Sequence, residues 1–81
     1  MRNNPDRLSL ADLPVGSACR VNSVELAGLL RRRILDLGII PGTVVECIRK
    51  SPAGDPTAYG VRGATIALRH DDASQISVSL I

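Results

Sequence analysis

Apolar and polar positions along the first half of the chain follow two different periods. Residues 17–24 have the composition of a strand, and from residue 25 to 37 the period becomes helical. Five apolar residues in that second segment share one helical face: Leu26, Leu29, Leu30, Ile34 and Leu37. Gly38 then stands where a left-handed C-terminal cap is expected, and Pro41-Gly42 turns the chain. The pattern predicts a strand, a helix over 25–37 and a tight turn.

The second half of the chain carries short β-branched runs between turn residues. The predicted strands are 43–50, 57–63, 64–69 and 74–80, with a Pro- and Gly-rich turn at 51–56. About five short strands, one helix after the first of them and connections of a few residues favour a compact, mainly β barrel.

The N-terminal residues divide into two parts. Residues 1–7 are polar and lack apolar periodicity, so they are expected to form a flexible leader. Order is expected to begin at Leu8, with Leu10 and Leu13 placing one apolar side under the domain. The predicted domain therefore covers residues 8–81.

Composition narrows the class of protein. A chain of 81 residues holds one small core, and Tyr59 is its single aromatic residue. The net charge of +2 and the scatter of the basic residues do not indicate nucleic-acid binding, and one ring offers no platform for stacked bases. The chain lacks an apolar run long enough to span a bilayer and a signal-peptide pattern, so we expect a cytoplasmic protein without direct membrane insertion.

Two residues of the predicted helix stand out against its apolar face. Arg33 falls near the middle of that face, so its guanidinium needs partners: backbone carbonyls, a carboxylate such as Asp36 or Glu46, or else an anion or a binding partner. Leu35 falls on the outer face. With its neighbours it forms either a partner-docking patch or a common exposed leucine. The residues of this candidate patch are Gly28, Arg31, Arg32 and Leu35.

Candidate catalytic and metal-binding chemistry is sparse. His70, Asp71 and Asp72 carry groups that can bind a cation, but consecutive turn residues seldom point at one ion, so a solvated turn is the competing interpretation. Cys19 and Cys47 lack the spacing of a zinc site and are expected to be small buried apolar residues. The sequence lacks a phosphate-binding glycine motif and a catalytic set, so no enzymatic activity and no cofactor are expected; Fe²⁺ or another divalent ion is not supported by ligands.

The segment RRRILDLGIIPGT, with GDP, VRG and IALR further on, resembles the FeoA family of ferrous-iron transport proteins. The resemblance runs from about Leu8 to Val78. Its most specific residues are Arg33, Ile34, Leu37, Gly38, Pro41 and Gly42, among which Arg33 and the last three are expected to have structural roles.

The resemblance implies a mainly β fold: a small SH3-like β-barrel of about five strands with one α-helix inserted after the first strand. It also implies a small accessory protein of ferrous-iron uptake, a protein interaction module that docks on and modulates the FeoB-type membrane permease through its cytoplasmic GTPase portion. An alternative is a metal- or peptide-responsive regulatory module like the C-terminal domain of iron-dependent repressors. The oligomeric state, the docking surface and the sign of the modulation stay open.

Overall fold

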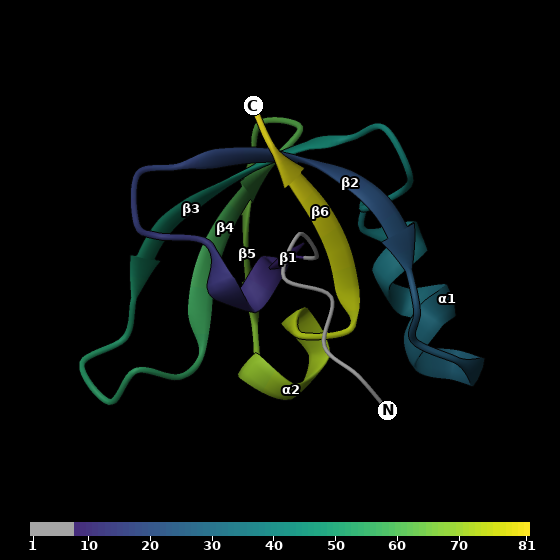
Figure 1. The fold of residues 1–81 in the computed structure, drawn as a ribbon. Coiled ribbons are helices and arrows are strands. Elements are labelled where there is room, and N and C mark those ends of the chain that lie inside the picture. Colours follow the sequence, from purple (N-terminus) through teal and green to yellow (C-terminus); the bar gives the residue numbers. More distant parts are fainter. Residues whose placement is uncertain (1–7) are drawn as a thin grey trace, which may run out of the picture.

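The computed structural model describes residues 8–81, so the predicted leader at 1–7 lies outside the described residues. Six antiparallel strands form one sheet in the order β1-β6-β2-β3-β4-β5 (Figure 1). The strands are β1 (Leu8–Ser9), β2 (Ala18–Val24), β3 (Val44–Lys50), β4 (Thr57–Val61), β5 (Ala64–Leu68) and β6 (Ile76–Leu80). The helices are η1 (Leu10–Asp12, a 3₁₀ turn), α1 (Gly28–Asp36) and α2 (His70–Ala73).

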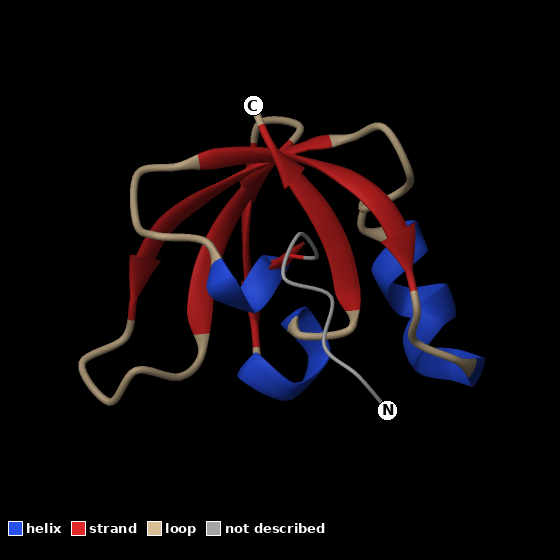
Figure 2. Cartoon of the chain, viewed as in Figure 1, coloured by secondary structure: helices blue, strands red, loops and turns tan. Residues whose placement is uncertain are grey.

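The sheet is strongly curved but open. β1 pairs only with β6, and β5 pairs only with β4, so the two outer strands do not close a barrel. Figure 2 shows η1 and α2 under the arch of the strands, with α1 beside it. The predicted mainly β class and the helix between two early strands are confirmed. The sheet has one more strand than predicted, because the chain at Leu8 pairs with β6 before it enters η1.

The core lies on the concave side of the sheet. Cys19 of β2 and Cys47 of β3 point into it as free thiols, which confirms that they serve as small buried side chains. Tyr59 of β4 is buried as well, and its hydroxyl donates a hydrogen bond of 3.2 Å to the carbonyl of Leu10. This bond ties η1 to the sheet, so the segment around Leu10 does tuck beneath the domain.

The C-terminal end of α1 is fixed by a Schellman motif. The amide of Gly38 donates to the carbonyl of Leu35 over 3.0 Å, and the amide of Ile39 donates to the carbonyl of Ile34 over 3.3 Å. Gly38 has the left-handed φ of 97° that this motif requires, which confirms the predicted cap. Ile34 and Ile39 are both buried, which gives the motif its apolar contact and attaches this end of the helix to the core.

A tight turn then sets the chain into β3. The amide of Thr43 donates to the carbonyl of Ile40 over 3.0 Å, with Pro41 and Gly42 between them. Gly42 has a φ of 93°, which is the conformation that a type II turn needs at its third residue. The Gly42 amide also donates to the carbonyl of Val21 over 2.8 Å. The predicted turn at Pro41-Gly42 is confirmed, and its hydrogen bond to Val21 also ties it to β2, which the sequence did not indicate.

Two local predictions need correction. The helix was predicted from residue 25 but begins at Gly28, because the amide of Glu25 donates to the carbonyl of Gln75 and the chain stays extended through Ala27. Residues 70–73, predicted as a turn, form the short helix α2. The carboxylate of Asp55, in the loop before β4, accepts a hydrogen bond of 2.8 Å from the amide of His70 and so satisfies a free donor at the start of α2.

Candidate partner-docking surface

The orientation of α1 differs from the sequence-based prediction. Ile34 is the only fully buried residue of the helix, and Arg33 is exposed rather than directed into the core. The physical reason is that the core takes up Leu26, which precedes the helix, and Ile34 near its C-terminal end, but no residue of the first helical turn. Ile34 and Ile39 pack in the same core cluster, which turns Ile34 inward, whereas Leu29 in the first turn is 90 % exposed. Figure 1 shows α1 beside the sheet rather than beneath it.

Leu35 is also placed differently. It is partly buried and packs against the core, so it does not form the exposed centre of the predicted patch. The other patch residues, Gly28, Arg31 and Arg32, are exposed as expected. Leu29, which the periodicity placed on the core face, is 90 % exposed. A helical wheel built on Leu26, Leu29, Leu30, Ile34 and Leu37 pointed the wrong way, because Leu29 and Leu30 of the first turn do not reach the core.

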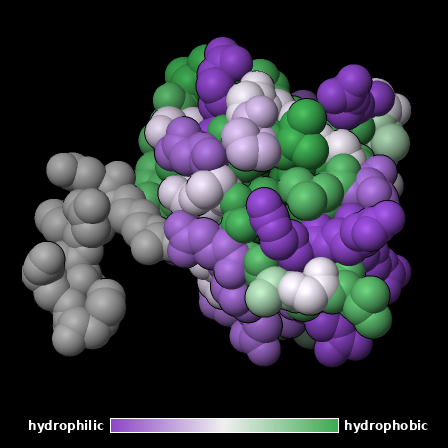
Figure 3. Space-filling view, turned by 90° about the vertical axis from the view of Figure 1, so that its right-hand side faces the viewer, coloured by the Kyte–Doolittle hydropathy of each residue, from purple (hydrophilic) through white to green (hydrophobic). Residues whose placement is uncertain are grey.

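The outward side of α1 carries a stripe that we call the α1 stripe: Leu29, Arg32, Arg33 and Asp36. These positions follow i, i+3, i+4 and i+7 spacing, so they lie along one face of the helix. Within residues 8–81, no ion pair engages Arg32 or Arg33. Figure 3 views this side of the molecule, where apolar and strongly hydrophilic side chains stand next to one another. An exposed leucine between unpaired arginines suits a partner with an apolar and acidic surface.

A small groove of about 180 Å³ separates α1 from β5 and α2. Leu30 and Leu37 of the helix line one wall, and Ala67 lies on the opposite wall. Its charged lining residues are Arg33, Arg69 and Asp72, so two positive charges and one negative charge border the groove. The groove extends the apolar and basic surface beyond the α1 stripe toward the outer edge of the sheet.

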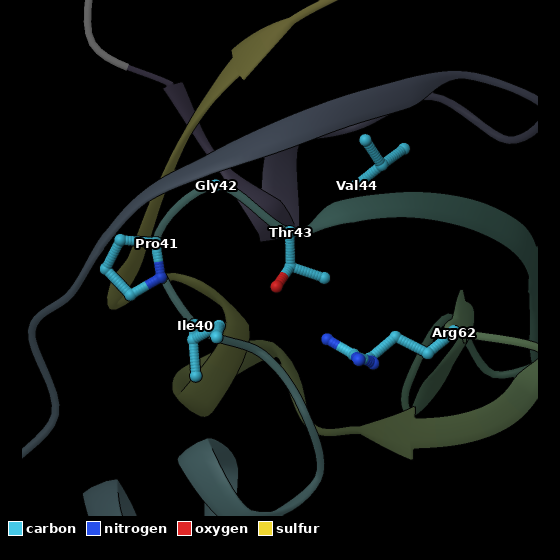
Figure 4. Close-up of a pocket in the computed structure, with 6 residues that line it drawn as sticks. All are labelled: Ile40, Pro41, Gly42, Thr43, Val44 and Arg62. Atoms are coloured by element: carbon cyan, nitrogen blue, oxygen red, sulfur yellow. The ribbon is translucent and has the colours of Figure 1, made fainter.

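A larger hollow of about 540 Å³ opens where α1 ends (Figure 4). Its lining comes from the turn after the helix, from the start of β3 and from the β4–β5 connection: Ile40, Pro41, Gly42, Thr43, Val44 and Arg62. The Thr43 hydroxyl donates to the Gly38 carbonyl over 3.0 Å. Two of the predicted structural residues, Pro41 and Gly42, therefore line a surface hollow, which their turn chemistry alone did not reveal.

The titratable groups with shifted pKa values belong to the core. Burial raises the pKa of the Cys19 thiol to about 11 and raises that of Cys47 as well. Burial also raises the pKa of Tyr59 to about 12. Each shift favours the neutral form, so these thiols are poor nucleophiles near neutral pH.

The three candidate metal ligands stand at the start of α2. His70 and Asp71 are exposed, and Asp72 is half-buried. Among residues 8–81, the His, Cys, Asp and Glu side chains do not gather in any group of three that could hold a metal ion. In that same part of the chain, no helix has the length and apolar character to cross a membrane.

The curved antiparallel sheet, the short connections and the helix between β2 and β3 define a small SH3-like β domain with open surfaces. A family model described as the FeoA domain matches residues 8–80. The chain belongs to the FeoA family, as the resemblance in its sequence indicated.

Relatives with known names agree with this assignment. The chain is 32 % identical over 74 residues to the Fe(2+) transport protein A/Fe(2+) transporter FeoB fusion protein of Porphyromonas gingivalis, a match that spans 91 % of this chain and 9 % of the fusion protein. FeoA from Chlorobium tepidum has a TM-score of 0.87 and 31 % identity, covering 91 % of this chain and 70 % of that one.

FeoA from Stenotrophomonas maltophilia, solved with zinc and described as a prokaryotic SH3 domain protein, has a TM-score of 0.80 and 29 % identity over 89 % of each chain. A manganese-dependent transcriptional repressor matches with a TM-score of 0.83 over 96 % of this chain and 38 % of its own. At 19 % identity this likeness concerns the fold alone.

Proposed function

We propose that this chain is an accessory module of ferrous-iron uptake that docks on the cytoplasmic GTPase portion of a FeoB-type permease and modulates it. The observation that carries the proposal is the Porphyromonas gingivalis relative, whose name describes transport protein A and FeoB joined in one polypeptide. Covalent linkage raises the effective concentration of one domain at the other, which is useful for domains that contact each other.

The α1 stripe supports the proposal as the docking surface. Leu29 provides an exposed apolar anchor, and one turn further along lie Arg32 and Arg33, whose guanidinium groups form no ion pair with any residue of the described range 8–81. Gly28 and Arg31 extend the same end of the helix, whereas Leu35 contributes to packing. The proposed docking surface therefore stays on α1, as in the sequence-based prediction, but its apolar anchor is Leu29 instead of Leu35.

The test is binding of the full chain, isotope-labelled for NMR, to the permease held in lipid nanodiscs. We expect chemical-shift changes at the α1 stripe, and competition by the separate GTPase portion. Leu29→Glu should weaken binding at least tenfold without changing the unfolding midpoint. Val15→Glu is the matched control, because Val15 is also an exposed apolar residue and lies outside α1. Absence of binding by the unaltered chain across salt concentrations would contradict the proposal.

The repressor-like alternative has less support. It depends on fold likeness to regulators, which does not transfer function. Calorimetric titration with ferrous or manganous ion separates the two hypotheses: micromolar binding that His70→Ala abolishes would favour the regulatory module.

A further inference from the structure

The turn between β4 and β5 contains an unusual arginine. The two-residue connection Arg62-Gly63 joins paired residues Val61 and Ala64, and both of its φ values are positive, at 52° and 84°. Such a type I′ turn favours Asn or Gly at its first position. Within residues 8–81, Arg62 is the only residue other than glycine with a positive φ. The chain thus places a long cationic side chain where the backbone favours a short one, which indicates a use for that side chain.

The side chain of Arg62 crosses the end of α1. Its Cδ atom lies 2.8 Å from the position that a Cβ on Gly38 would occupy, so the missing side chain of Gly38 leaves room for the arginine stem. The guanidinium group then points toward Thr43 and Ile40, across the hollow at the end of α1 (Figure 4). Gly38 therefore both permits the Schellman motif and lets Arg62 reach this hollow.

The guanidinium lacks a partner in the described part of the chain. No hydrogen bond or ion pair engages Arg62 within residues 8–81. Two of the residues that line the hollow are exposed branched aliphatic side chains: Ile40 is 41 % exposed, and Val44 is 45 % exposed. An arginine fork beside branched aliphatic side chains suits a carboxylate next to an aliphatic group, because the guanidinium can donate two parallel hydrogen bonds to the carboxylate while the aliphatic groups pack against each other.

A second shallow hollow continues the first across the outer face of the sheet. It shares Val44 and Arg62 with the first, and it adds two residues of β3, the acidic Glu46 and Ile48, which is 39 % exposed. Gly60 of β4 contributes bare backbone beside Ile48. Ile40, Val44 and Ile48 therefore follow one another along a continuous groove, which has Arg62 at its side.

We propose that this groove, which we call the Arg62 groove, binds a partner segment that places an Asp or Glu carboxylate on Arg62 and aliphatic side chains over Val44 and Ile48. The inference names the chemistry of a second contact with the permease and rests on the proposed function. A purely structural role for Arg62, as a cation near the negative end of the α1 dipole, predicts an effect on stability and none on binding.

The test measures the affinity of the full chain for the permease in nanodiscs. Arg62→Asn removes the guanidinium and suits the left-handed backbone, so the variant should fold at least as well as the unaltered chain. We expect its Kd to rise at least tenfold, consistent with loss of a charge-assisted pair. The Kd of Arg62→Lys, which keeps the charge, should lie between that of the unaltered chain and that of Arg62→Asn. Val44→Asp should also weaken binding.

Arg20→Gln is the matched control. Arg20 donates to the carbonyl of Gly42 over 3.4 Å, so it contacts the same turn, but it does not line the hollow. Unchanged affinity of Arg62→Asn, or an equal loss in Arg20→Gln, would overturn the Arg62 groove and leave the proposed function standing. Failure of the unaltered chain to bind would overturn both.

Discussion

Two glycines that follow α1 have left-handed backbone conformations. Replacing each of them with alanine separates two contributions to the loss in the free energy of unfolding: the strain in the backbone and the steric clash of the new Cβ. Gly38 and Gly42 have similar φ values of 97° and 93°. A Cβ on Gly42 would meet nothing within 4 Å, whereas one on Gly38 would lie 2.8 Å from Cδ of Arg62. Alanine at either position has the same unfavourable backbone conformation, but only at Gly38 must a neighbouring side chain move.

The magnitudes follow from these two geometries. Placing a residue with a Cβ in the left-handed region costs about 1–2 kcal/mol, which is the expected loss in the free energy of unfolding for Gly42→Ala. Displacing Arg62 from its rotamer adds about 0.5–1.5 kcal/mol in Gly38→Ala. In an Arg62→Asn background, which lacks the Cδ atom, Gly38→Ala should cost no more than Gly42→Ala.

Urea unfolding followed by far-UV circular dichroism measures these differences, with fluorescence of Tyr59 as a second probe because it is the single, buried aromatic residue. The reasoning would be refuted if Gly38→Ala were no more destabilising than Gly42→Ala. It would also be refuted if the Arg62→Asn background left the cost of Gly38→Ala unchanged.

Three further predictions concern the core. Ile34→Ala should lower the free energy of unfolding by about 2–5 kcal/mol, whereas Leu29→Ala should change it by less than about 0.5 kcal/mol; equal costs in urea unfolding would mean that α1 is oriented differently. Tyr59→Phe should cost about 0.5–1.5 kcal/mol in the same assay, since the Leu10 carbonyl loses its donor, and no loss would argue against that bond. Burial raises the pKa of Cys19 from 9.0 to about 11, so the protonated thiol stabilises the fold fully below pH 9 and this contribution is lost as the pH rises toward 11. When the unfolding midpoint is plotted against pH from 9 to 11, it should fall more steeply for the unaltered chain than for Cys19→Ala. Parallel plots would contradict the raised pKa of Cys19.

Local sequence patterns determined most of the elements of this fold. Strands β2 to β6 follow from short β-branched runs between turn or loop residues, and the turn at Pro41-Gly42 follows from backbone preferences of those two residues. Gly38 marked the end of α1 because a left-handed cap there needs a residue without a Cβ. These features depend on residues adjacent in the chain, so the sequence alone specifies them.

Tertiary contacts decided which way α1 faces and what its side chains do. The five apolar residues of the predicted helical face did not all reach the core: Leu26 and Ile34 are buried, whereas Leu29 is exposed, and so is Arg33, which the same face placed inward. The meeting of Arg62 with Gly38 joins residues 24 positions apart in the sequence, and no local pattern specifies it. Burial is a property of the assembled surface. For that reason the sequence indicated the elements and the family, while the α1 stripe and the Arg62 groove became visible only once the sheet and the helix had been placed together.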